Sequence, residues 1–207
     1  MHRQSIMIDY LVHLYKRGTI PFQSLSALSD MDAIDLMQAL YMEGSVFWER
    51  FKEPADYLQL RKQVEEWLRR EFVAKGGQPR AAYPIYMAWG RSKWMETMLD
   101  ATTLATTLEI QVPLSAFSER VVSFTYPDSM VSFLLNLERN PAYYLPGYHG
   151  QVFTYAEMYT IVETNGLPGY SWGTELPSEM ANYVEAQVWD HAPLLAYKQV
   201  NECSPAD

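Results

Sequence analysis

The chain has 207 residues, of which 48% are hydrophobic and 14% aromatic, so it is long enough to form one domain with a substantial core. This composition excludes an intrinsically disordered chain. Its 16 basic and 25 acidic residues give a net charge of −9, which repels phosphate backbones and argues against nucleic acid as a partner. We expect no membrane partner either, because no apolar run approaches the roughly 20 residues that span a bilayer.

The N-terminus and the cysteine content indicate a cytoplasmic protein. Asp9 and His13 interrupt the first apolar stretch, so the hydrophobic segment of a secretion signal is missing. The single cysteine, Cys203, excludes a disulfide framework and a thiolate metal site, and the four histidines lack the spacing of zinc ligands. We therefore expect neither a metal nor another cofactor. The sequence does not fix the oligomeric state.

The first third of the chain is predicted to be helical. The apolar spacing of residues 6–14 fits one face of a helix that ends at Gly18. Ser29 fits the N-cap of a second helix, and Asp30 and Asp32 in its first turn complement the helix dipole. Because the stretch that follows Gly18 is acidic, we do not interpret these helices as a DNA-reading helix-turn-helix.

A third helix is expected over residues 54–74, because Pro54 is tolerated in a first helical turn and two glycines follow the segment. On its charged face, Glu65 and Arg69 stand four residues apart in the favourable orientation for an ion pair. We interpret this face as a salt-linked, solvent-exposed surface.

After residue 77 the hydrophobic period changes from that of helices to that of strands. The sequence from Thr154 to Glu157 is a capping box, which predicts the start of a helix. Short strands are expected over 83–89, 107–112, 120–126, 151–153 and 183–189, with helices over 92–102, 129–137 and 155–164.

The predicted fold class is α+β, with a helical N-terminal layer packed on a mostly antiparallel sheet. We divide the chain into a helical N-terminal subdomain over residues 1–50, an α+β body over 51–200 and a tail over 201–207. Two of the expected strands share a Glu-x-Gln-Val sequence, once at Glu109 and once at Glu185. Two copies do not establish a repeat.

The late strand over residues 183–189 gives the first site candidate. Its small aliphatic side chains alternate with Tyr183, Glu185, Gln187 and Trp189, an unusual set for a merely solvated face. A carboxylate between aromatic rings can act as a general base or orient a hydroxyl group if burial raises its pKa. The alternative is an exposed Glu185 or a structural ion pair. We take Glu185 as the candidate catalytic residue and the other three as ligand contacts.

A second candidate is an anion site at the turn that follows Trp89. There an expected strand passes into an expected helix, so free backbone N–H groups can meet a hydroxyl and two cations. The alternative is an ordinary capped helix after a tight turn. The residues predicted to bind a phosphate or carboxylate are Gly90, Arg91, Ser92 and Lys93, with Arg80 supplying further charge.

A third candidate is the aromatic loop over residues 143–150, in which we predict that Tyr148 contacts a ligand or a partner. The alternative role for these aromatic side chains is to pin an irregular loop to the sheet.

Several motifs are similar to those of a family of bacterial proteins of about this length, to which no activity is assigned. The similarity spans about residues 57–194 and implies a shared fold without implying a reaction. The motifs are Lys75-Gly-Gly-x-Pro79 with Tyr86-Met-x-x-Gly90, then Val122-Ser-Phe-Thr-Tyr126-x-Asp128-Ser129, and Glu185-Ala-Gln-Val-Trp-Asp190.

The chain also resembles ADP-ribosyltransferase-like domains, in which a late strand presents a glutamate that holds the nicotinamide ribose. The resemblance implies this role for Glu185 and a place at an early strand edge for Arg80. It departs from that family at Tyr183, where Gln or Glu is usual.

Two functional hypotheses follow. The first is a non-catalytic binding or interaction protein that presents the 183–189 face and the aromatic loop to a protein partner or a small anionic ligand. The second is an enzyme acting on a nucleotide or another phosphorylated small molecule, with the Gly90 turn holding the anion and Glu185 as acid, base or ribose anchor. The second hypothesis requires that the Gly90 turn and Glu185 open into one cleft.

Overall fold

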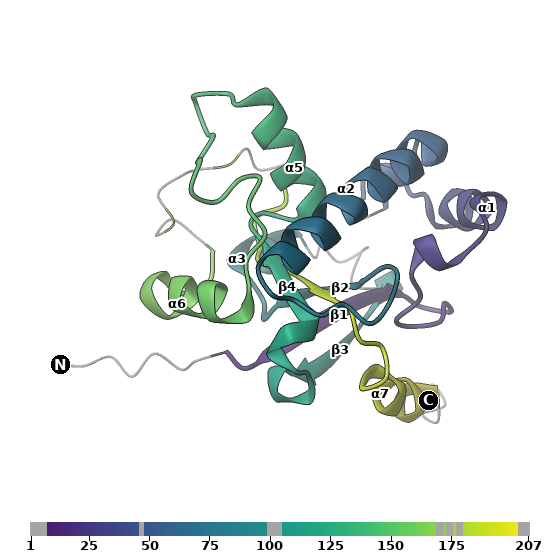
Figure 1. The fold of residues 1–207 in the computed structure, drawn as a ribbon. Coiled ribbons are helices and arrows are strands. Elements are labelled where there is room, and N and C mark those ends of the chain that lie inside the picture. The colour runs from purple at the N-terminus through teal and green to yellow at the C-terminus, as the bar shows by residue number, and fades with distance from the viewer. Residues whose placement is uncertain are drawn as a thin grey trace.

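The computed structural model describes residues 8–45, 48–98, 105–168, 172, 176 and 180–202. Within these ranges a five-stranded antiparallel sheet is flanked by helices (Figure 1), which confirms the predicted α+β class. The strands are β1 (Tyr10–Lys16), β2 (Ile85–Trp89), β3 (Thr107–Pro113), β4 (Val122–Thr125) and β5 (Glu185–Val188). The helices are α1 (Asp30–Leu40), α2 (Pro54–Ala74), α3 (Lys93–Met98), α5 (Ser129–Glu138), α6 (Tyr155–Asn165) and α7 (Leu194–Glu202), with short 3₁₀ helices η1 (Leu25–Ala27), η2 (Glu49–Phe51), η3 (Leu114–Ala116) and η4 (Glu119–Val121).

The strands are ordered β3-β1-β2-β5-β4, and every neighbouring pair is antiparallel. In this register Glu185 of β5 lies between Ala88 of β2 and Thr125 of β4. Gln187, two residues further along β5, lies opposite Ser123 of β4. Because directly opposed residues point to the same face of a sheet, the register gathers these polar side chains on one face.

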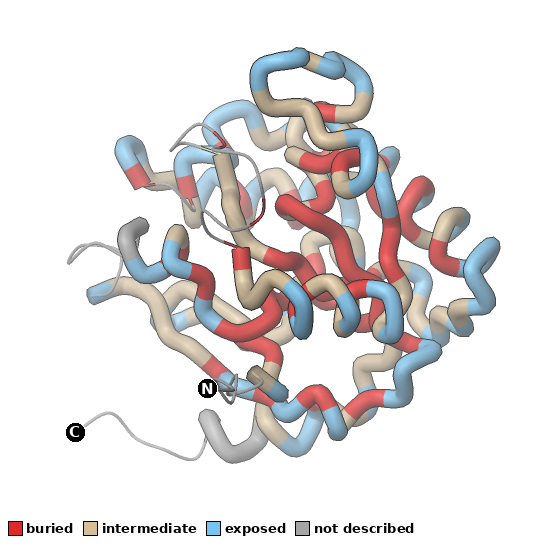
Figure 2. The backbone as a smooth tube through the Cα atoms, turned by 90° about the vertical axis from the view of Figure 1, so that its left-hand side faces the viewer, coloured by how far each residue is buried: buried red, intermediate tan, exposed pale blue. Residues whose placement is uncertain are grey.

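The two faces of the sheet are packed differently. On the first face, α2 packs Trp67 and Leu68 against the buried ring of Trp189. On the second face, the aliphatic side chains of β5 join Met158 of α6 and Leu194 of α7 in the most extensive apolar cluster. Figure 1 shows α1 and α2 above the strands and α7 below them. Every residue of β4 and β5 is buried, as are four of the five residues of β2. Figure 2 shows the buried stretches of the backbone in red.

Helix starts agree with the local sequence signals. The Oγ of Ser29 accepts a hydrogen bond from the backbone N–H of Asp32 (3.2 Å) at the start of α1. At the start of α6, Glu157 accepts from the backbone N–H of Thr154 (2.7 Å), which completes the predicted capping box. The bounds of α2, residues 54–74, are those predicted from its initial proline and the glycines that follow it.

The prediction of a helix over residues 6–14 is wrong. Tyr10–Lys16 form β1, which pairs with both β3 and β2, and residues 6 and 7 lie outside the described part of the chain. Leu11 is buried on one face of the sheet and Val12 on the other. A strand covered on both faces carries apolar residues at consecutive positions, and such a short run fits a helix as well as a strand. The first fifty residues therefore contribute a strand to the sheet of the predicted body.

Two smaller expectations also change. The strand expected over residues 151–153 is a single bridge, in which Phe153 pairs with Phe124. The helix expected over 92–102 is α3, and residues 99–104 lie outside the described ranges, as does Cys203. In the part of the chain that the structure describes, no helix combines the length and apolar character needed to cross a membrane.

Candidate functional site

A cavity of about 330 Å³ opens on the first face of the sheet, between the strands, η2, α2 and the start of α5. Its walls come from segments that are far apart in the sequence, which only the fold brings together. The polar residues that line it are Arg50, Tyr57, Arg61, Tyr86, Thr107, Asp128, Ser129, Tyr183 and Glu185.

Glu185 is placed on this wall by the alternation of β5, and its side chain is almost fully buried, with the residue 6% exposed. Its Oε1 accepts hydrogen bonds from the backbone N–H of Ser129 (3.0 Å) and from Nε2 of Gln187 (3.1 Å). Its Oε2 accepts a longer bond from the hydroxyl of Tyr183 (3.4 Å). The carboxyl group therefore has fixed partners and belongs to the cavity wall.

Asp128 brings a second carboxyl group to the same wall. It is the N-cap of α5, and its Oδ1 accepts from the backbone N–H of Val131 (2.9 Å). Burial, and then the negative charge of Asp128, raise the pKa of Glu185 to about 7. Burial also raises the pKa of Asp128. Glu185 can therefore take up or release a proton near neutral pH, as an acid–base group must.

Tyrosines form much of the remaining polar wall. The hydroxyl of Tyr86 donates to Oε1 of Glu65 (3.2 Å). Burial, followed by the charge of Glu185, raises the pKa of Tyr183 well above its ordinary value, so this side chain stays a neutral phenol that can donate a hydrogen bond. Together with Tyr57 and Trp48, these tyrosines give the cavity four aromatic side chains, which suits the flat face of a ring-bearing ligand.

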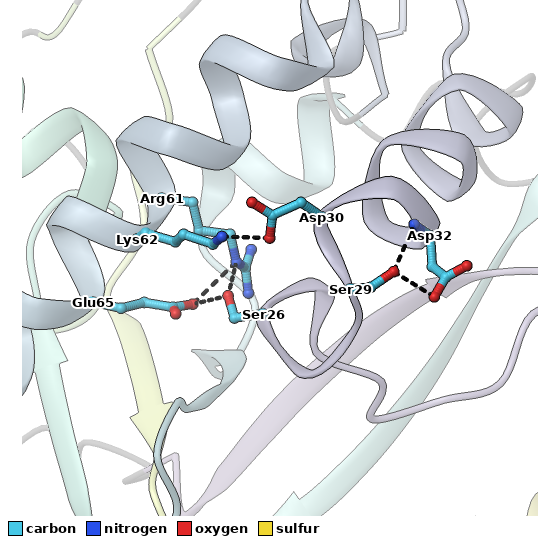
Figure 3. Close-up of polar contacts among 7 residues, drawn as sticks. All are labelled: Ser26, Ser29, Asp30, Asp32, Arg61, Lys62 and Glu65. Atoms are coloured by element: carbon cyan, nitrogen blue, oxygen red, sulfur yellow. Dashed lines mark hydrogen bonds and ion pairs between the residues drawn. The ribbon is translucent and has the colours of Figure 1, made fainter.

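Two arginines line the cavity, and they differ in whether a carboxylate pairs with them. Arg61 forms an ion pair with Glu65 (3.0 Å), a carboxylate that also accepts from Ser26 (2.9 Å), as Figure 3 shows. The guanidinium group of Arg61 also lies over the ring of Tyr86, 4.5 Å from its centroid. Arg50 is exposed, and among the described residues it forms no ion pair within 4 Å. Arg50 is thus the cation on this wall that a ligand can neutralise.

The turn predicted to hold an anion does not join the cavity, so its geometry does not meet the requirement of the enzyme hypothesis. None of Gly90, Arg91, Ser92 and Lys93 lines it. Arg91 forms an ion pair with Glu109, and the Oγ of Ser92 accepts from the backbone N–H of Met95 as a helix cap. A Cβ at Gly90 would lie 2.5 Å from Ile8, and the positive φ of +61° favours glycine there. Backbone packing at the end of β2 therefore accounts for this glycine.

Two other predicted contacts, Arg80 and Tyr148, also lie away from the cavity. Arg80 pairs with Asp190 (2.7 Å), and its side chain is 69% exposed. Tyr148 packs against Tyr126 and Trp172 on the second face of the sheet, with ring centroids 5.9 and 5.4 Å away. This geometry matches the alternative that the aromatic loop is pinned to the sheet.

The 183–189 face is accessible to a ligand at one end of β5, at Tyr183 and Glu185. Gln187 and Trp189 are both 0% exposed, and side chains of α2 pack against Trp189, so neither can contact a partner or ligand directly. The fold places them behind the carboxyl group of Glu185, where they can act on it through hydrogen bonds.

The interpretation of the charged face of α2 as exposed, which rests on Glu65 with Arg69 and on Glu66 with Arg70, holds for Glu66 and Arg70 and is wrong for the other pair. Glu65 is 7% exposed and pairs with Arg61 in place of Arg69. Arg69 turns inward, donates to the carbonyl oxygen of Ala81 (2.6 Å) and lies over the ring of Trp189. The sheet covers more of α2 than its apolar stripe. Glu65, which lies beside that stripe, is therefore buried next to Tyr86 of β2.

Sequence reasoning missed Arg50, Tyr57, Arg61 and Tyr86, and it interpreted Asp128 only as a helix cap, which it also is. One signal was available. Residues 57, 61 and 65 stand four apart on one face of the predicted helix, next to its apolar stripe. An aromatic, a cation and an acid in that position can form a polar wall at the edge of a core.

Comparisons with protein-family models, with curated proteins and with solved structures each returned no match. Functional inference therefore rests on the cavity and its residues. In the described ranges, no group of three or more His, Cys, Asp or Glu side chains is placed to hold a metal ion.

Proposed function

We propose that the cavity binds a small anionic molecule that carries a flat ring, of the nucleotide class, and that Glu185 exchanges a proton with it. The observation that supports this proposal best is that the buried Glu185 and Asp128 share a cavity wall with Arg50, a cation without a carboxylate partner among the described residues. The charge of Arg50 also acts on Asp128, whose pKa it lowers against the effect of burial. Perturbed acids that converge on a pocket with a cation are typical of sites that act on a ligand.

The composition of the wall supports this class of ligand. Guanidinium groups match the geometry of phosphate and carboxylate oxygens, so Arg50 is the proposed anion contact. Tyr57, Tyr86 and Tyr183 line the cavity with aromatic side chains, which suit a planar group. The cavity of about 330 Å³ falls at the lower end of the range of about 300–1,000 Å³ that small-molecule pockets span.

Glu185 is the proposed acid–base residue. Protonated, it donates to an oxygen of the ligand, and ionised, it accepts a proton or a hydrogen bond from a hydroxyl group. A ribose hydroxyl of a nucleotide is a suitable partner, and this is also the role that the resemblance to ADP-ribosyltransferase-like domains implies. Arg80 has no part in the proposal, because it lies outside the cavity.

The test is a binding screen by thermal shift and calorimetry with AMP, ADP, ATP, NAD, a sugar phosphate, inorganic phosphate and uncharged adenosine. A ligand at a hundred times its Kd should stabilise the fold by about 2.7 kcal/mol. We expect nucleotides to bind more tightly than adenosine or phosphate alone, and Arg50→Met to weaken their binding at least about tenfold, the loss of one charged hydrogen bond.

Arg80→Met is the matched control, because Arg80 is an exposed arginine outside the cavity. Its binding affinity should equal that of the unaltered protein. A screen without any bound nucleotide, or an equal loss of affinity in the Arg50 and Arg80 variants, would contradict the proposal.

A further inference from the structure

A chain of hydrogen bonds runs behind the cavity and ends on Glu185. Nε1 of Trp189 donates to Oγ of Ser123 (2.9 Å), and that hydroxyl donates to Oε1 of Gln187 (2.9 Å). Nε2 of Gln187 then donates to Oγ1 of Thr125 (3.0 Å) and to Oε1 of Glu185 (3.1 Å). The four residues before the carboxyl group are each 0% exposed, so water does not compete for these bonds.

The direction of this chain is fixed by chemistry. An indole N–H can only donate, so the oxygen of Ser123 must accept from Trp189. The hydroxyl of Ser123 has one hydrogen, which is then free to donate to Gln187. Because an ionised Glu185 can only accept, the amide of Gln187 points its NH₂ group at Glu185 and its oxygen at Ser123. The reverse orientation would set the carbonyl oxygen of Gln187 against the carboxylate oxygen of Glu185, two acceptors with no hydrogen between them.

The two oxygens of Glu185 are consequently not equivalent. Oε1 accepts from Gln187 and from the backbone N–H of Ser129, so both donors occupy it. Oε2 accepts a long bond from Tyr183, which lines the cavity together with Glu185, and the hydroxyl of Ser129 also stabilises the ionised carboxylate. A proton on Oε1 would displace a donor, whereas a proton on Oε2 would not.

We propose that Gln187 is a positioning residue: held by Trp189 and Ser123, it anchors Oε1 of Glu185 and leaves Oε2 as the oxygen that exchanges a proton in the cavity. The use of that proton on a ligand rests on the proposed function, whereas the anchoring is a property of the free protein. The N–H of Gln187 also favours the ionised carboxylate, which opposes the rise in its pKa that burial causes.

The test is an NMR titration of the Glu185 carboxyl carbon in the ligand-free protein, with the signal assigned by its absence in Glu185→Gln. Gln187→Met keeps the length of the side chain and removes the donor. We expect the pKa of Glu185 to rise by about one unit or more in this variant, because one hydrogen bond to a charged group is lost. An unchanged pKa in folded Gln187→Met would overturn the proposal.

Gln111→Met is the matched control, because Gln111 also donates to a glutamate two residues before it, Glu109 (2.8 Å), but on an exposed strand. It should leave the titration of Glu185 unchanged, and an equal shift in both variants would count against a specific role for Gln187.

If Gln187→Met does not fold, the proposal can be tested by an NMR titration of the unaltered protein. The side-chain NH₂ signals of Gln187 should shift with pH at the same midpoint as Glu185, and the absence of such a shift would overturn the proposal. Because both titrations use protein without ligand, their result is independent of the nucleotide screen. If no nucleotide binds but the titration shows the expected effect of Gln187, the proposed function is wrong and the anchoring role of Gln187 still holds.

Discussion

Two strands of the sheet carry the sequence Glu-x-Gln-Val, and the fold gives them different surroundings. In both strands the valine is 0% exposed on the second face, and the glutamine donates to the glutamate two residues before it. β3 is an edge strand, where Gln111 is exposed and Glu109 pairs with the exposed Arg91. β5 lies between β2 and β4, where Gln187 is fully buried. Position in the sheet, rather than the local sequence, thus decides which carboxyl group is buried in the wall of the cavity.

The largest difference that we expect between the two strands is in stability. Replacing the glutamine by methionine should lower the free energy of unfolding more in β5, at Gln187, than in β3, at Gln111. Gln187→Met removes the acceptor of the buried Ser123 hydroxyl and the donor to the buried Thr125, and we expect a loss of about 2–4 kcal/mol. Gln111→Met on the exposed strand should cost less than about 0.5 kcal/mol. Denaturant unfolding at one pH measures both, and similar losses would show that the buried chain contributes no more than a surface contact.

The glutamates should differ in how pH affects stability. The pKa of Glu185 is raised in the folded state, so the free energy of unfolding falls as pH rises from about 4.5 to 7. Glu185→Gln removes this fall and should exceed the unaltered protein in stability at pH 8 by on the order of 1–3 kcal/mol, with little difference near pH 4.5.

Glu109→Gln at the edge strand is the control for this measurement, since its carboxyl group is paired at the surface. It should change stability by less than about 1 kcal/mol at both pH values. Thermal or denaturant unfolding at pH 4.5 and 8 gives both results, and a gain at pH 8 shared by the two variants would remove the distinction between the strands.

The smallest effect is expected for the ion pair that anchors Glu109. Arg91→Met should cost about 0.2–1 kcal/mol, and 1 M salt should abolish most of the difference, because the pair is at the surface. A double-mutant cycle of Arg91 and Glu109 measures the coupling. A coupling that persists in high salt would indicate that the edge strand also holds a buried charge.

The elements that could be predicted from the sequence are those whose signals are local. The bounds of α2 follow from a proline and two glycines, and the start of α6 from the capping box at Thr154. The alternation of β5 also predicted correctly that its aliphatic side chains enter the core while Glu185 faces the other way. Each of these features depends on residues within one turn or one strand.

What could not be predicted depends on contacts between distant segments. β1 was mistaken for a helix because a strand covered on both faces has apolar neighbours at consecutive positions. Arg50, Arg61 and Asp128 come from η2, α2 and the N-cap of α5, so no spacing in the sequence marks them as one site. The burial of Trp189 likewise depends on the packing of α2 against its ring.

The strand order also has a consequence for how the chain folds. β5, near the C-terminus, separates β2 from β4, so the sheet stays in two parts until this last strand is inserted. Such long-range pairing slows folding, because a large loop must close before its contacts form. During synthesis from the N-terminus, the other four strands are made before β5. Glu185, an acid of the cavity wall, is part of β5 and is therefore placed only when this strand joins the sheet. We therefore expect the ligand-binding competence of a nascent chain to appear late and all at once.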